Sequence, residues 1–137
     1  MELQDYFQSS TVHAIERLKF LQYLLKVKEE IELGDNNYKT AYVLFNEAIE
    51  FNSSYAPAYY CLGMVEFIIG KNDSGFQNFS KSIELDEKYK EAFHYRGVLS
   101  FELGNKELAF LDLQKAMILG YKQSEEFIIE KKLEDHF

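Results

Sequence analysis

The chain has 137 residues and a formal net charge of −8, from 15 basic and 23 acidic side chains. That length suits one domain or one short repeat array, and the acidic balance excludes the basic surface that nucleic-acid binding needs. No apolar run approaches the roughly 20 residues of a membrane span, and residues 1–5 carry acid where a secretory signal would be basic. A single cysteine, Cys61, excludes an internal disulfide. We therefore expect a folded cytoplasmic protein.

The first predicted element covers residues 10–33, which contain neither Gly nor Pro. Four apolar residues in its second half follow helical spacing, and they are Phe20, Leu24, Val27 and Ile31. Either one long helix or a separate leading helix with a kink near Lys19 fits this segment. We assign residues 1–20 to an N-terminal extension or leading helix.

The strongest signal is an internal repeat of 34 residues. Eight residues recur at that distance, namely Ala58, Gly63, Phe67, Gly70, Phe76, Lys81, Leu85 and Lys88, matched by Ala92, Gly97, Phe101, Gly104, Phe110, Lys115, Leu119 and Lys122. Each unit has an apolar segment of period 3.6, a turn led by Gly and a second such segment, which predicts a pair of helices. The expected helices after the first are 38–51, 56–69, 73–85, 90–103, 106–119 and 124–135.

The glycines explain how such pairs would pack. Gly63 and Gly97 lack a side chain and let the two helices of a unit approach closely. Gly70 and Gly104 follow a helix directly, where a left-handed residue costs least if it is glycine. Among the residues that come next, Asn72 or Asp73, and Asn105, are candidate N-caps.

This pattern resembles the tetratricopeptide repeat, a family of 34-residue helix-turn-helix units. The residues at its characteristic positions are Tyr59, Leu62, Gly63, Gly75, Phe79 and Ser82 in one unit, and Phe93, Arg96, Gly97, Ala109, Leu113 and Ala116 in the next. The resemblance implies an all-α, right-handed α-α superhelix of about seven helices. Its expected parts are three repeats at 21–55, 56–89 and 90–123 within 21–123, followed by a C-terminal capping helix within 124–137.

The resemblance also implies two structural details in the last repeat. Members with Arg at the position of Arg96 often carry Asp at the position of Asp112, so an Arg96–Asp112 ion pair is expected between the two helices. In the capping helix, Phe127 should pack near Leu113 and Ala116. Glu130 and Lys131 stand where a further repeat would need an apolar and a small residue, so they would mark the end of the stack.

The chain shows no pattern for catalysis, a metal or a cofactor. The three histidines are widely separated, and Cys61 has no base and orienting group to make it a nucleophile. We expect a non-enzymatic protein with no cofactor and no metal, in which Cys61 is a semi-buried thiol.

In the resembling family the first helix of each repeat lines a concave groove. The residues that fall on it here are Tyr60, Cys61, Met64, Phe67, Ile68, His94, Tyr95, Val98 and Phe101. They are mostly apolar or aromatic, which favours recognition of an apolar or aromatic peptide or helix from a partner protein. Some family members instead hold a terminal carboxylate with Lys and Arg. Glu91 and Tyr95 stand at two of those positions in this chain, which disfavours such ligands.

Several alternatives stay open for this surface. A structural or homodimer role could use the same apolar residues, the leading helix could cover them, or the chain could be a small secretion-type chaperone. The acidic segments at both ends favour a basic or amphipathic partner, although acidity can also serve solubility alone.

Overall fold

The computed structural model describes residues 38–136, with side chains described over 41–50 and 52–134. These residues form α3 (Tyr38–Phe51), α4 (Ala56–Ile68), α5 (Asn72–Leu85), α6 (Lys90–Glu102), α7 (Lys106–Ile118), α8 (Lys122–Glu130) and the 3-10 helix η2 (Leu133–His136). No strand occurs between residues 38 and 136, which confirms the all-α prediction for this part of the chain. The expected helix at 10–33 and the extension at 1–20 lie outside the described residues.

The chain divides into two units, residues 1–53 and 54–137. The described element of the first unit is α3, an amphipathic helix. Ala41 and Phe45 are its buried hydrophobic residues and lie one helical turn apart. The division of the chain into repeats at 21–55, 56–89 and 90–123 remains a prediction.

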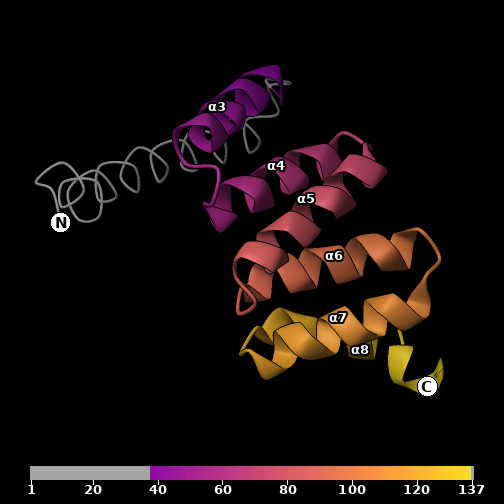
Figure 1. The fold of residues 1–137 in the computed structure, drawn as a ribbon. Helices are drawn as coiled ribbons and strands as arrows, with labels where there is room; N and C mark the ends of the chain where they lie inside the picture. Colours follow the sequence, from indigo (N-terminus) through magenta and orange to yellow (C-terminus); the bar gives the residue numbers. More distant parts are fainter. Residues whose placement is uncertain (1–37, 137) are drawn as a thin grey trace, which may run out of the picture. The chain divides into compact units, whose positions relative to one another are not determined.

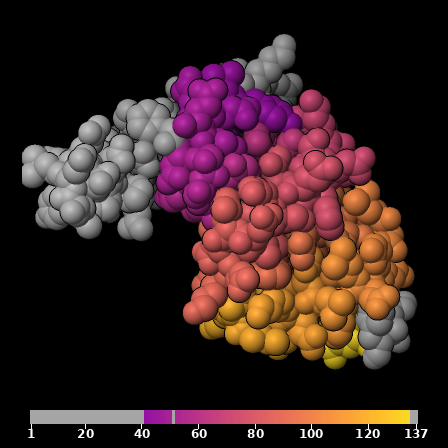
Figure 2. Space-filling view, in the orientation of Figure 1, coloured from indigo at the N-terminus to yellow at the C-terminus, as the bar shows by residue number. Residues whose placement is uncertain are grey.

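The second unit is a stack of helices that follows chain order (Figure 1). Helix α4 pairs with α5 and α6 pairs with α7, while α5 packs on α6 and α7 packs on α8. Helix α4 also contacts α6, so the first helices of successive pairs are neighbours. On the face seen in Figure 2, the atoms of α5, α6 and α7 form one continuous packed surface.

Close contact within each pair depends on Gly63 and Gly97, as predicted. A Cβ added at Gly63 would lie 2.8 Å from the Phe79 ring, and one added at Gly97 would lie 2.8 Å from Leu113 Cγ. Real Cβ atoms do not tolerate such distances, so the neighbour would have to move. Phe79 and Leu113 are themselves fully buried and form part of the core.

Three helices each end in a turn of the same type. Gly70, Gly104 and Gly120 have positive φ, and each donates to the carbonyl three residues earlier. The residue after each glycine donates to the carbonyl five residues earlier, at 2.8–2.9 Å, so each turn is a Schellman motif. Because that next residue is also the N-cap of the following helix, the turn is as short as the motif allows.

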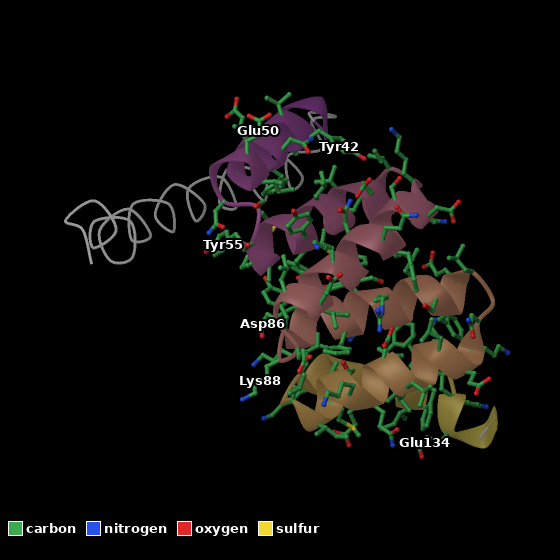
Figure 3. The ribbon with its side chains drawn as sticks, in the orientation of Figure 1. Tyr42, Glu50, Tyr55, Asp86, Lys88 and Glu134 are labelled. Atoms are coloured by element: carbon green, nitrogen blue, oxygen red, sulfur yellow. The ribbon has the colours of Figure 1, made fainter. Side chains whose placement is uncertain are left out.

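This short turn corrects one predicted cap and confirms the other. The N-cap of α5 is Lys71 rather than Asn72 or Asp73, because the helix starts directly after the Schellman motif. Asn105 is the N-cap of α7, and its side chain accepts a hydrogen bond from the Leu108 amide at 3.2 Å. The α5–α6 turn contains no glycine; there the Lys88 amide donates to Asp86 Oδ1 at 3.0 Å (Figure 3).

The C-terminal end differs from the single helix expected at 124–135. Helix α8 begins at Lys122 and ends at Glu130, and Lys132 adopts a left-handed conformation with φ of 53°. The chain then turns into η2, which buries Leu133 completely. Leu133 packs with Ala109, Leu113 and Ile128. Phe127 packs against this cluster, which contains Leu113, one of the two residues it was predicted to lie near.

Candidate functional site

The candidate site is the face formed by α4, α6 and α8, which we call the A-helix face. Side chains from neighbouring helices meet along it: Tyr60 and Tyr95 have ring centroids 6.1 Å apart, and Phe101 meets Phe127 edge-on at 5.5 Å. One stripe runs along each helix at helical spacing, consisting of Met64 and Ile68 on α4, Glu91, Tyr95, Val98 and Glu102 on α6, and Glu125 and Ile129 on α8.

Aromatic side chains fill the beginning of this face. Tyr60 lies 5.2 Å from Tyr89 and 6.1 Å from both Phe79 and Tyr95, measured between ring centroids. Burial, followed by the nearby Tyr95, raises the pKa of Tyr60 above its ordinary value. Burial and a hydrogen bond with Tyr95 do the same for Tyr121. These phenols therefore stay protonated and link α4, α6 and the start of α8.

Two residues predicted to contact a partner are buried by the chain itself, so the prediction is wrong for them. His94 shares a 2.8 Å hydrogen bond with Ser124 through Nδ1 and packs edge-on against Tyr121 and Phe127. Cys61 is also buried. Helical register places both residues toward the A-helix face, but the adjacent side chains cover them.

Burial also sets the protonation states of His94 and Cys61. Burial lowers the pKa of His94 to about 4, so the imidazole is neutral at pH 7. Burial raises the pKa of the Cys61 thiol, which keeps it protonated and unreactive. Both side chains are buried, and at neutral pH the Cys61 thiol lacks the ionisation of a nucleophile.

Phe101 is partly a packing residue. Its ring contacts Phe127, and it lies against the core cluster of Ala109, Leu113 and Ile128. The ammonium of Lys131 lies 5.9 Å from the Phe101 ring centroid and 5.8 Å from that of Phe127. Phe101 therefore fills the space between α6 and α8, with a cation on the outer side of the ring pair.

The remaining predicted residues keep accessible surface. Ile68 is 40% exposed, and Tyr60, Met64, Phe67, Tyr95 and Val98 are half-buried. Ile129, at the stripe position equivalent to Tyr95, is 61% exposed and was not predicted. Its 34-residue register with Cys61 and Tyr95 was the signal that could have identified it.

The Arg96–Asp112 ion pair expected between α6 and α7 is present. Arg96 Nε donates to Asp112 Oδ2 at 2.7 Å and Arg96 Nη2 donates to Oδ1 at 2.8 Å, a bidentate arrangement. Arg96 Nη1 also donates to Ser80 Oγ on α5 at 3.1 Å. The guanidinium lies over the Phe76 and Phe93 rings at 5.6 and 5.9 Å. This network joins three helices behind the A-helix face.

Between residues 41 and 134, no three His, Cys, Asp or Glu side chains gather where they could hold a metal ion. None of the helices from α3 to η2 is long and apolar enough to cross a membrane.

Comparison with solved structures decides the fold. The TPR domain of Arabidopsis OM64 superposes with a TM-score of 0.73 and 20% identity, over 89% of this chain and 96% of that one. The first TPR of Spaghetti (RPAP3) superposes with a TM-score of 0.74 and 16% identity, over 87% and 95%. This chain has the tetratricopeptide repeat fold. No family model and no curated protein matches the sequence.

Two of the solved structures that resemble this chain contain a bound peptide. The Spaghetti domain is bound to the HSP90 peptide SRMEEVD. The type III secretion chaperone SycD of Yersinia enterocolitica is in complex with a peptide of the translocator YopD, and superposes with a TM-score of 0.63 and 16% identity over 91% of this chain and 88% of that one. At these identities the likeness establishes the fold of this chain, and the ligands belong to those proteins.

Proposed function

We propose that this chain is a non-enzymatic protein-interaction module that binds an apolar or aromatic segment of a partner protein on its A-helix face. The observation that carries the proposal is the set of accessible apolar and aromatic side chains on the three helices, consisting of Ile68, Met64, Tyr95, Val98 and Ile129. Aromatic and Met side chains provide large, adaptable contact area for an apolar helix.

The tetratricopeptide repeat fold supports this proposal because other proteins with it hold peptides, as in the Spaghetti and SycD complexes. The ligand here should differ from the EEVD-type peptide of the Spaghetti complex. The stripe on α6 presents Glu91 and Glu102, and α8 presents Glu125. Carboxylates near a terminal carboxylate or an acidic side chain would repel it.

The test uses a fluorescent 14-residue peptide with Leu at helical spacing on one face and Gln at all remaining positions. We expect it to bind the full chain, and we expect Ile68→Glu with Ile129→Glu to weaken binding by about tenfold or more, a loss of at least ~1.4 kcal/mol of binding free energy. Both residues are exposed, so the substitutions should not disturb the core.

The matched control is Leu111→Glu with Ile118→Glu on α7, where the side chains are 54% and 71% exposed. This pair changes the same charge and removes similar apolar surface away from the A-helix face. Fluorescence anisotropy should show unchanged affinity for it. Equal losses in both double variants, or no binding by the parent chain, would contradict the proposal.

The alternative is self-association through the same face, which the high exposure of Ile129 also favours. It predicts a dimer that persists on dilution and that Ile68→Glu with Ile129→Glu converts to monomer. Light scattering over a concentration series separates this role from peptide binding by a monomer.

A further inference from the structure

The A-helix face is uneven in charge. Helix α4 contains no basic residue, and the stripe on α6 begins and ends with carboxylates, Glu91 and Glu102. The first turn of α8 adds Glu125, which is exposed. Arg96, the basic residue in the middle of α6, points between the helices and is neutralised by Asp112.

The location of Glu91 is supported by its neighbours. The Glu91 carboxylate is close enough to contribute to the raised pKa of Tyr121, at the start of α8, and to that of Tyr89, just before α6. Glu91 therefore lies at the end of the face that holds Tyr89 and Tyr121. Glu102 lies at the other end of the same stripe. The half-buried Tyr95 and Val98 lie between them.

The chain itself places a cation against this face. Lys131 reaches back from the end of α8, and its ammonium lies over the ring pair of Phe101 and Phe127 within 6 Å of both centroids. This is the geometry of a cation–π contact. Because Lys131 already takes this position over the ring pair, a partner's cations are expected beside the glutamates and not at these rings.

We propose that the occupant of the A-helix face is a cationic amphipathic segment. Its apolar side chains would contact Met64, Tyr95 and Val98, and its Lys or Arg side chains would lie near the surrounding glutamates. This inference rests on the proposed binding function and adds the sign of the partner's charge. Complementary charge around an apolar strip chiefly sets partner choice and association rate, and salt weakens it.

Three peptides of 14 residues test this directly on the full chain. All carry Leu at the same helical positions. The remaining positions are all Lys in the first peptide, all Gln in the second and all Glu in the third. We expect the Lys peptide to bind about tenfold more tightly than the Gln peptide at low salt, and the Glu peptide to bind more weakly than both. The advantage of the Lys peptide should shrink in 0.5 M NaCl, where the Debye length is about 4 Å.

Two charge-reversal variants locate the effect. Glu91→Lys with Glu125→Lys alters first-turn acids of α6 and α8, and Asp73→Lys with Glu107→Lys alters first-turn acids of α5 and α7. Net charge and the interaction with the helix dipole change alike in the two variants. We expect the first to weaken the Lys peptide about tenfold and the second to leave it within about twofold.

The outcomes separate the two proposals. If the Gln peptide binds and the Lys peptide gains nothing over it, the inference fails while the binding function stands. The inference also fails on its own if both reversal variants weaken the Lys peptide equally, because the attraction would then be a general effect of net charge. If none of the three peptides binds, the function and the inference fail together.

Discussion

At the scale of single residues, two equivalent repeat positions solve the same packing problem differently. Asp112 pairs with Arg96 across α6 and α7. Its equivalent 34 residues earlier, Asn78, donates to the buried Glu66, and Leu62 stands where Arg96 would be. Asp112 and Asn78 thus each have a partner suited to their charge.

Removing one member of the ion pair should be costly. With Asp112 almost fully buried, Asp112→Asn or Asp112→Ala leaves the guanidinium without its counter-charge, and we expect a loss of about 3–5 kcal/mol of unfolding free energy. Urea denaturation measures this. The double variant Arg96→Met with Asp112→Leu is the control and should lose less, because it removes both charges. Parent-like stability of both single variants would show that the pair contributes nothing.

His94 should make stability depend on pH. Its folded pKa of about 4 lies below the ordinary 6.5, so between these values the unfolded state binds a proton that the folded state does not. Stability therefore falls as pH falls below 6.5, by about 2 kcal/mol on going from pH 7.5 to pH 5. Urea denaturation at the two pH values tests this, with His94→Gln as the control that keeps a partner for Ser124. The same pH dependence in parent and variant would contradict it.

At the scale of elements, the helix pairs depend on the small residue at their crossing. In Gly97→Ala the new Cβ would lie 2.8 Å from Leu113 Cγ and 3.1 Å from the Ala109 carbonyl. We expect overpacking to cost about 1–3 kcal/mol, measured by thermal denaturation. Gln114→Ala, at an exposed position of α7, is the control for the helix propensity of alanine. A Gly97→Ala protein at least as stable as the parent would mean that the helices adjust without cost.

The end of the stack depends on η2. Leu133 is fully buried against Ala109, Leu113 and Ile128, so Leu133→Ala should lower the unfolding free energy by about 2–5 kcal/mol. Ile129→Ala, at a nearby but 61% exposed residue, should cost far less. Equal effects of the two substitutions would show that η2 does not close the core.

At the scale of the whole molecule, the repeat made most helices of the second unit predictable. The 34-residue period locates Gly63 and Gly97 at the crossings and Gly70 and Gly104 at the turns, and the structure uses all four in those roles. The end of α8 was not predictable in this way. Lys132 takes the left-handed position that glycine takes elsewhere, and no repeat follows to reveal where Leu133 packs.

The candidate site was predictable as a face but not residue by residue. Helical register gives the direction of a side chain, whereas its exposure depends on which neighbours cover it. Ser124 and Tyr121 cover His94 because α8 packs beside α6, and a single sequence does not specify that contact. Ile68, at the end of α4, stays 40% exposed.

Binding at the A-helix face is tested most directly by mapping amide chemical shifts of the ¹⁵N-labelled full chain as the Leu/Gln peptide is added. We predict that the largest changes fall on α4, α6 and α8, centred on Met64, Tyr95, Val98 and Ile129, with little change on α5 and α7. Changes centred on Leu111 and Ile118 of α7, or no saturable change on any helix, would contradict the account.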